Sequence, residues 1–279
     1  MGEYLLRSRP SALEGRRLIM DYCDLDSDKW RQYSQSLRPP MSWIFGREAA
    51  RLLQYEQTLN AFFDDSIFVS RPEAELFRPH APKPERIRVV GNGVDREFFS
   101  PSPIRPSSLP ASQPPSSEAQ PPSTQHQAPA ASRLVFTGAM DYQANVDGIL
   151  WFCRDVWPGL QAKVPGLQLY IVGANPVPEV KKLAGPNVRV TGYVQDIREY
   201  YRLADVCIIP LRLARGVQNK LLEAMAMGKP VVTTSKVLQG IQAEPEHDLL
   251  AADEPQAFER QVLRLLRDSD LAGGLGRRA

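Results

Sequence analysis

Short apolar strands alternate with helices between Arg133 and Asp268, and this alternation constrains the fold more than any other feature. The predicted strands cover residues 133–138, 167–173, 187–194, 206–211 and 230–234. One predicted helix begins at Asn145 and ends at Pro158, and the others cover residues 178–184, 196–204, 219–228 and 255–268. Strands that alternate with helices form parallel sheets whose crossover helices cover both faces. The pattern therefore predicts a doubly wound α/β domain.

The first hundred residues show a shorter and less regular version of the same pattern. Strands are predicted over residues 16–23, 66–70 and 86–95, the last ending in a turn. Helices are predicted over residues 42–63 and 71–78. About 100 residues is short for a complete doubly wound domain, so this part has the content of half of one.

Between these parts lies a tract rich in proline, serine, glutamine and alanine. Residues 101–130 hold nine of the chain's 25 prolines. Such a composition cannot bury enough apolar surface to offset its ordering entropy, which predicts a disordered linker over residues 101–132. The predicted organisation is a partial first lobe over 1–100, the linker, and a Rossmann-like lobe over 133–279.

The overall composition suits a globular protein and excludes few partners. The chain has 279 residues, 43% apolar, with a net charge of +2, so its charge does not indicate nucleic acid binding. No apolar run approaches the roughly 18 residues of a spanning helix. Cys23, Cys153 and Cys207 stand far apart in apolar contexts, which predicts reduced, buried thiols of a cytoplasmic protein.

Glycines stand at the exits of several predicted strands. Gly138, Gly173 and Gly192 follow strands, and Gly216 leads into the helix over 219–228. Ligands of open α/β sheets bind beyond the carboxyl ends of the strands, near helix N-termini. Each glycine alone fits an ordinary turn, but four at one edge favour a phosphate-bearing ligand.

The helix over 219–228 carries an acid and a lysine one turn apart. Glu223 can accept hydrogen bonds from two ribose hydroxyls, and Lys220, with the backbone N–H groups of 217–219, can bind a diphosphate. The alternative is a Glu–Lys pair on a solvated helix face. The apolar residues that surround Glu223 between positions 221 and 226 argue against a broad polar face.

At this point several segments resemble a known family. "NKLLEAMAMGKPVVTT" resembles the nucleotide-sugar signature of GT-B glycosyltransferases, especially retaining enzymes of glycosyltransferase family 4. "VGNGVDREFFSP" resembles the loop that joins the two lobes of that family. "DLDSDKWRQYS", "GAMDYQANVDGILWF" and "VTGYVQDIREYYRLADVCIIPLRLARGVQNK" are similar to sugar transferases associated with exosortase/PEP-CTERM exopolysaccharide systems of Gram-negative bacteria.

The resemblance implies an enzyme that moves a sugar from a nucleotide-diphosphate donor to a glycan or lipid-linked acceptor. It further implies a retaining mechanism, a role in exopolysaccharide biosynthesis, and no cofactor or metal. The implied location is the cytoplasm, with peripheral contact to the inner membrane through a lipid-linked acceptor. Nucleic acid is not among the implied partners.

Carried over by position, the resemblance assigns donor-binding roles. Glu223 would bind the donor ribose, and the segment from Gly216 through Asn219 to Lys220 would face the diphosphate or the sugar. The segment from Gly192 to Val194 would contact the base through its backbone. Gly138 would allow a close approach of the donor.

Two positions depart from the family pattern. Arg215 stands eight residues before Glu223, where the family has an acid that contacts the donor sugar. Only Asn145 is present where many relatives carry an Arg/Lys pair after the first strand of this lobe. Positive charge from Arg215 and Lys220 would compensate, with Arg215 serving the diphosphate. The sequence indicates no catalytic base.

Other readings of the chain remain open. Asp24 and Asp26 form an acid-x-acid pattern that binds metal-nucleotides in another glycosyltransferase fold, but here they follow a strand as loop or cap residues. His80, His126 and His247 are predicted in loops. A nicotinamide-dependent oxidoreductase is a weak alternative, because the first strand–helix turn of the second lobe lacks the G-x-G-x-x-G motif that such enzymes use to bind the dinucleotide.

The start and end of the chain suggest a further alternative. From the resemblance, we expect the chain to lack the first strands and helices of the family's N-terminal lobe and the C-terminal helices that cross back to it. A truncated lobe leaves unpaired strand edges and exposed core. The alternative to an active transferase is therefore an inactive or fragmentary module that binds a nucleotide sugar without transferring it.

Overall fold

The structure, a computed structural model, describes residues 15–101, 132–214 and 216–278. These residues form two compact units. The first comprises the described residues up to Asn92 with the short segments 216–217 and 239–241, and the second comprises the remainder. Most of the predicted linker, residues 102–131, lies outside the described residues, as do Arg215 and His126.

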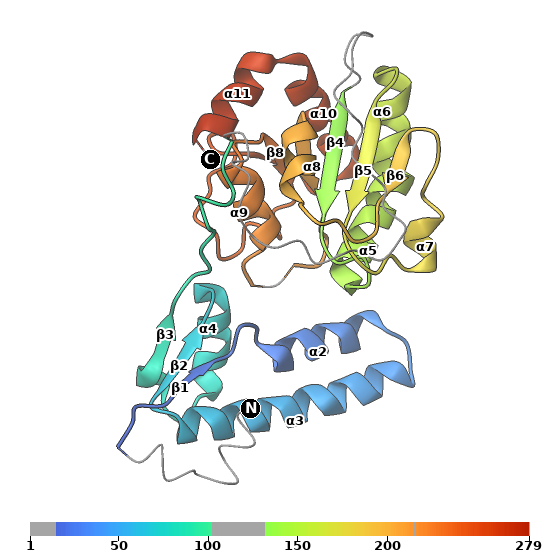
Figure 1. The fold of residues 1–279 in the computed structure, drawn as a ribbon. Coiled ribbons are helices and arrows are strands. Elements are labelled where there is room, and N and C mark those ends of the chain that lie inside the picture. The colour runs from blue at the N-terminus through green and yellow to red at the C-terminus, as the bar shows by residue number, and fades with distance from the viewer. Residues whose placement is uncertain (1–14, 102–131, 215, 279) are drawn as a thin grey trace. The chain divides into compact units, whose positions relative to one another are not determined.

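The first unit, blue to cyan in Figure 1, is built on a three-stranded parallel sheet with the order β1-β2-β3. Its strands are β1 (Ile19–Asp21), β2 (Asp65–Phe68) and β3 (Ile87–Val89). Its helices are α2 (Asp26–Ser36), α3 (Met41–Phe62) and α4 (Arg71–Phe77), with 3₁₀ turns over Arg78–His80 and Pro84–Arg86. Within the described residues no helix is both long enough and apolar enough to cross a membrane.

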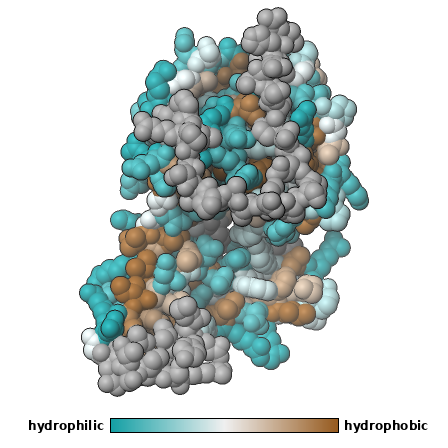
Figure 2. Space-filling view, viewed as in Figure 1, coloured by the Kyte–Doolittle hydropathy of each residue, from teal (hydrophilic) through white to brown (hydrophobic). Residues whose placement is uncertain are grey.

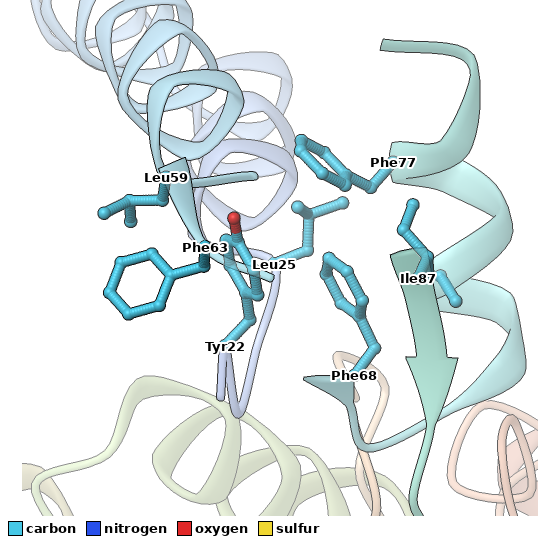
Figure 3. Packing of buried hydrophobic residues seen from close by; sticks show 8 residues of the cluster. Tyr22, Leu25, Leu59, Phe63, Phe68, Phe77 and Ile87 are labelled. Atoms are coloured by element: carbon cyan, nitrogen blue, oxygen red, sulfur yellow. The ribbon is translucent and has the colours of Figure 1, made fainter. Parts of the chain in front are cut away.

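Four of the eight buried residues in the core of this unit are aromatic (Figure 3). Phe68 of β2 stacks on Tyr22 with 4.7 Å between ring centroids, and Phe77 of α4 lies 5.4 Å from Phe68. Leu59 and Ile87 are also buried in this cluster. Phe68 and Phe77 are fully buried, so α4 is fixed to the sheet by rings that exclude water.

Helix α2 was not predicted, because its start depends on a residue far along the chain. The Glu56 carboxylate, buried in α3, accepts the backbone N–H of Ser27 at 3.0 Å. The Tyr22 hydroxyl donates to the Glu56 carbonyl at 2.9 Å. Burial raises the pKa of Glu56, and the hydrogen bonds from Ser27 oppose that rise. A tertiary contact thus satisfies the N-terminal N–H groups that a local cap would normally satisfy.

Helix α4 shows the opposite case, in which the local sequence is sufficient. The Ser70 hydroxyl accepts from the backbone N–H of Glu73, and Pro72 stands in the first turn. The Ser70 side chain also donates to the Glu73 carboxylate at 2.8 Å. Serine before a proline-containing first turn is a strong helix start, and the predicted helix over 71–78 matches Arg71–Phe77.

The second unit holds a six-stranded parallel sheet with the order β6-β5-β4-β7-β8-β9 and helices on both faces (Figure 1). Its strands are β4 (Arg133–Thr137), β5 (Gln168–Val172), β6 (Val188–Val190), β7 (Val206–Ile209), β8 (Val231–Thr233) and β9 (Leu250–Ala251). Its helices are α5 (Gln143–Trp151), α6 (Trp157–Lys163), α7 (Pro178–Lys181), α8 (Arg198–Leu203), α9 (Asn219–Ala226), α10 (Pro255–Arg267) and α11 (Ser269–Arg278). This strand order is the Rossmann order, which confirms the prediction of a doubly wound α/β lobe.

The predicted end of a helix at Pro158 is wrong. Helices α5 and α6 are joined without a break by a π-helical turn over Phe152–Val156. This wider turn shifts the hydrogen-bond register, so Pro158 falls in the first turn of α6. Proline is tolerated there, because its missing N–H would have no intrahelical acceptor anyway.

The prediction that all three cysteines are buried is correct for one of them. Cys207 of β7 is buried, Cys153 is partly exposed and Cys23 is exposed. All three are free thiols. Cys23 adopts a positive φ of 55° in the turn that follows β1. Its side chain is exposed, whereas those of Tyr22 and Leu25 on either side of the turn are buried in the core.

Candidate functional site

The strand order of the second unit creates one topological switch point, between β4 and β7. From β4 the chain continues to β5 and β6 on one side, and from β7 it continues to β8 and β9 on the other. Helix α5 follows β4 and helix α9 follows β7. The crevice beyond the carboxyl ends of these two strands is where open α/β sheets bind their ligands.

Lys220 of α9 and Asn145 of α5 meet at this switch point. The Lys220 ammonium donates to the Asn145 side-chain carbonyl, and it lies 5.2 Å from the ring centroid of Phe136 on β4. The Asn145 amide in turn donates to the Ala139 carbonyl at 2.8 Å. Helices that start 76 positions apart are therefore joined by one cation and one amide.

Gly138, at the end of β4, lies directly next to the Lys220 and Asn145 side chains. A Cβ atom at Gly138 would lie 2.6 Å from the Asn145 amide nitrogen and 3.0 Å from the Lys220 ammonium. Its φ of 148° is also one that side chains rarely adopt. Glycine at this position keeps the backbone within reach of a ligand on Lys220.

Gly173 and Gly192 continue the same edge. The Gly138 carbonyl oxygen would lie 1.7 Å from a Cβ atom built on Gly173. The backbone N–H of Gly173 donates to the Gly192 carbonyl at 3.2 Å. Gly138, Gly173 and Gly192 therefore lie side by side at the ends of β4, β5 and β6, whereas Gly216, the fourth glycine predicted at this edge, groups with the first unit.

Glu223 is held by a hydrogen-bonded chain that crosses from α9 to β4. The Tyr201 hydroxyl of α8 donates to Glu223 Oε2 at 2.9 Å, and Thr137 Oγ1 lies 2.8 Å from the same hydroxyl. Because a phenol has one proton, Thr137 is the donor to Tyr201. No described residue hydrogen-bonds Glu223 Oε1, so that oxygen can accept from a ligand.

Charge and burial set the protonation of the cluster. Burial lowers the pKa of Lys220 to about 8, and the Glu223 carboxylate opposes that shift. Burial raises the pKa of Tyr201 well above its ordinary value, and the charge of Glu223 adds to the rise. At neutral pH the cluster thus offers an ammonium group for an anion and a carboxylate for hydroxyl groups.

The other predicted residues lie in the segments that follow β6, precede α9 or begin α9. Asn219 is the first residue of α9 and is exposed. Val194 is half-buried in the segment after β6. Gly216 is buried and belongs to a short segment that groups with the first unit. Arg215 lies outside the described residues.

Sequence reasoning missed Tyr201 and Thr137. Tyr201 stands in the predicted helix over 196–204 beside Tyr200, and both rings fit an apolar helix face. A buried tyrosine needs a hydrogen-bond partner for its hydroxyl, and that requirement was the available signal. Its partners lie 64 and 22 positions away, so only the folded chain identifies them.

Replacing Tyr201 by phenylalanine is expected to lower the free energy of unfolding by about 1–3 kcal/mol. The change leaves Thr137 Oγ1 and Glu223 Oε2 without this partner, and an unsatisfied buried polar group costs about that much. Urea unfolding followed by circular dichroism measures the effect. Tyr200→Phe is the matched control, because no described residue hydrogen-bonds the Tyr200 hydroxyl, and we expect a loss below about 0.5 kcal/mol. Equal losses in both variants would contradict the proposed chain of hydrogen bonds.

No metal site is found among the described residues. No group of three or more His, Cys, Asp and Glu side chains is arranged to hold a metal ion in the described ranges. Asp26 begins α2 and lies 3.6 Å from Lys29. His80 ends a 3₁₀ turn, and His247 pairs with Asp248 at 2.6 Å on the surface. None of these groups adds a ligand to the cluster at the switch point.

Comparison with known proteins matches the second unit to a family. Residues 131–268 match the family described as glycosyl transferases group 1. This segment contains the whole six-stranded sheet and the cluster around Lys220. A search of curated proteins gave no match.

Solved structures resemble both units. Anabaena HepE in complex with UDP and glucose has a TM-score of 0.64 at 15% identity, covering 96% of this chain and 67% of that one. WaaG, a glycosyltransferase involved in lipopolysaccharide biosynthesis, has a TM-score of 0.68 at 16% identity, covering 99% and 75%. Sucrose-phosphate synthase from Thermosynechococcus elongatus has a TM-score of 0.64 at 19% identity, covering 93% and 61%.

At these identities the likeness concerns the fold. The chain spans between 61% and 75% of the length of these three structures. The family match independently covers the lobe that carries the candidate site. The chain therefore has the GT-B glycosyltransferase fold, and residues 131–268 match the glycosyl transferases group 1 family.

Proposed function

We propose that this protein transfers a sugar from a nucleotide-diphosphate sugar to a glycan or lipid-linked acceptor. The observation that carries the proposal is the meeting of Lys220, Asn145, Gly138 and Glu223 at the switch point of the glycosyl transferases group 1 domain. An ammonium group, a close-lying backbone and a carboxylate are the groups that a diphosphate next to a ribose requires.

In this proposal each group has one role. The Lys220 ammonium binds the diphosphate, and Gly138 lets the phosphates approach the backbone. Glu223 accepts hydrogen bonds from the ribose hydroxyls, with Tyr201 holding its other oxygen. Asn145 keeps Lys220 in place through the bond between their side chains.

The outer residues complete the proposed donor site. Arg215, Gly216 and Asn219 would lie along the diphosphate and the sugar, and Gly192 and Val194 along the base. The resemblance of the α9 segment to retaining family 4 enzymes supports a retaining transfer. The similarity to exosortase-associated transferases supports a role in bacterial exopolysaccharide biosynthesis at the cytoplasmic face of the inner membrane.

Calorimetry with UDP, GDP and their common sugar conjugates tests the donor site. We expect saturable binding of one nucleotide series to the wild-type chain, weakened about 10- to 30-fold by Glu223→Ala. That loss corresponds to about 1.5–2 kcal/mol for hydrogen bonds to a charged group. The control is Glu179→Ala, since Glu179 is an exposed acid on α7 of the same unit and should leave the affinity unchanged.

Two results would reject parts of this proposal. A folded wild-type chain that binds none of these nucleotides would remove the donor site. Saturable binding without release of sugar from the bound donor, in the presence of lipid-linked and free glycan acceptors, would instead favour a binding module without transferase activity.

A further inference from the structure

The end of the α2–α3 hairpin in the first unit exposes a group of large apolar side chains. The exposed fractions are 43% for Leu37, 43% for Met41, 73% for Trp43 and 54% for Ile44. All four lie between the last turn of α2 and the first turn of α3. Figure 2 shows apolar surface in brown on this unit. A tryptophan three-quarters exposed to water next to three aliphatic side chains indicates a contact surface.

The packing of the hairpin itself does not need these side chains. Helices α2 and α3 are held together by Phe45, whose ring centroid lies 4.8 Å from that of Trp30 and 6.4 Å from that of Tyr33. Phe45 therefore fills the contact between the two helices. Its neighbours Trp43 and Ile44 project elsewhere and remain exposed.

Two arginines flank the apolar group. Arg38 and Arg47 are exposed, and neither forms an ion pair with a described residue. Arg47 follows Trp43 and Ile44 by four and three positions, so the three side chains share one helix face. The nearest acid on α3, Glu48, is paired with Arg51 at 3.8 Å. Residues 37–47 thus combine exposed apolar groups with unneutralised positive charge.

We propose that residues 37–47, which we call the hairpin tip, dock on the surface of an anionic lipid bilayer. Tryptophan and aliphatic side chains enter the boundary between headgroups and acyl chains. Arginine side chains extend their guanidinium groups back to lipid phosphates. Both chemistries are present on one face of the tip. This inference goes beyond the proposed donor site and does not depend on nucleotide binding.

Other exposed apolar residues of the unit lack this combination. Ile19, Val89 and Val90 lie on or next to the edge strands of the sheet. The arginines beside them are engaged with Asp65, at 2.6 Å for Arg17 and 3.5 Å for Arg88. Part of their charge is therefore compensated within the protein, unlike that of the hairpin tip.

Vesicle partitioning of the full chain tests the proposal. We expect binding to phosphatidylglycerol-containing vesicles and much weaker binding to phosphatidylcholine vesicles. Each of Arg38→Gln and Arg47→Gln should lower the partition coefficient about fivefold, because one basic side chain near an anionic membrane changes the affinity by about that factor. Trp43→Ser combined with Ile44→Ser should lower it by at least about tenfold. The control is Val90→Ser with Leu76→Ser, which removes two other apolar side chains of the unit that are 55% and 43% exposed.

Tryptophan fluorescence gives a second measurement that reports the location directly. Trp151 and Trp157 are buried, whereas Trp43 is the most exposed tryptophan of the described residues. Brominated lipids should quench part of the emission of the wild type, and Trp43→Phe, which keeps an apolar ring, should remove that quenched part. Binding that survives all tip variants, or quenching that persists in Trp43→Phe, would overturn the proposal. Absence of vesicle binding would also overturn the proposal. So would self-association of the chain that Trp43→Ser abolishes, because the hairpin tip would then bind a second copy of the chain and not a membrane.

Discussion

Gly173→Ala is expected to lower the free energy of unfolding of the second unit by about 2–6 kcal/mol. The φ of Gly173 is 151°, and a Cβ atom there would lie 1.7 Å from the Gly138 carbonyl oxygen. A strained backbone conformation costs about 1–3 kcal/mol and overpacking costs a similar amount. The obstructing atom is a backbone oxygen in the residue that follows β4, so no side-chain rotation relieves the contact.

Urea unfolding followed through the buried Trp151 and Trp157 measures this effect. Gly185→Ala is the matched control, because no atom lies within 4 Å of a Cβ atom built there. We expect it to change the free energy of unfolding by less than about 0.5 kcal/mol. A Gly173→Ala protein as stable as the control would show that the exits of β4 and β5 do not pack as closely as described.

Lys220→Gln is expected to weaken nucleotide-diphosphate binding about 100-fold at pH 7. Both partners of the proposed contact are charged, which places its contribution near 3 kcal/mol, the upper end for charge-assisted hydrogen bonds. Glutamine retains a polar side chain that can still pair with Asn145. Titration calorimetry against the same nucleotide series measures the loss, with Lys182→Gln, an exposed lysine after α7, as the control.

The pKa of Lys220 also predicts how wild-type affinity depends on pH. Below a pKa of about 8 the side chain is charged and attracts the diphosphate, and above it the neutral amine does not. Affinity should therefore fall about tenfold between pH 7 and pH 9. In Lys220→Gln the affinity should stay constant over this range. A wild-type affinity that stays constant too would exclude Lys220 as the diphosphate ligand.

Stability measurements separate lost binding from unfolding in this variant. The pKa of Lys220 is lower in the folded chain than its ordinary value of 10.5. The unfolded chain therefore binds more protons between about pH 8 and pH 10.5, and the contribution of this group to stability rises with pH there. At pH 7 the charged, desolvated lysine disfavours folding, so its replacement by glutamine should not lower the free energy of unfolding.

Most strands and helices of the second unit could be predicted because local patterns suffice for them, although β9 and α11 were not predicted. Strands such as 206–211 are continuous apolar runs, and helices such as 255–268 have apolar residues at helical spacing. A parallel sheet buried on both faces requires those patterns. The α4 start at Ser70 could be predicted for the same reason, since serine and proline act within one turn. Helix α2 could not, because its N-terminus is bound by Glu56 of α3.

Some features of the candidate site could likewise be predicted from the sequence, and others depended on tertiary structure. The spacing of Lys220 and Glu223, and the glycines at the strand exits, follow from the sequence alone, because helix periodicity and strand ends are local properties. That Lys220 reaches Asn145, and that Thr137 and Tyr201 hold Glu223, was decided by tertiary structure. These contacts exist because β4 and β7 are neighbours in the sheet although 68 positions separate their last and first residues. Strand order is set by packing over the whole domain, and no local pattern encodes it.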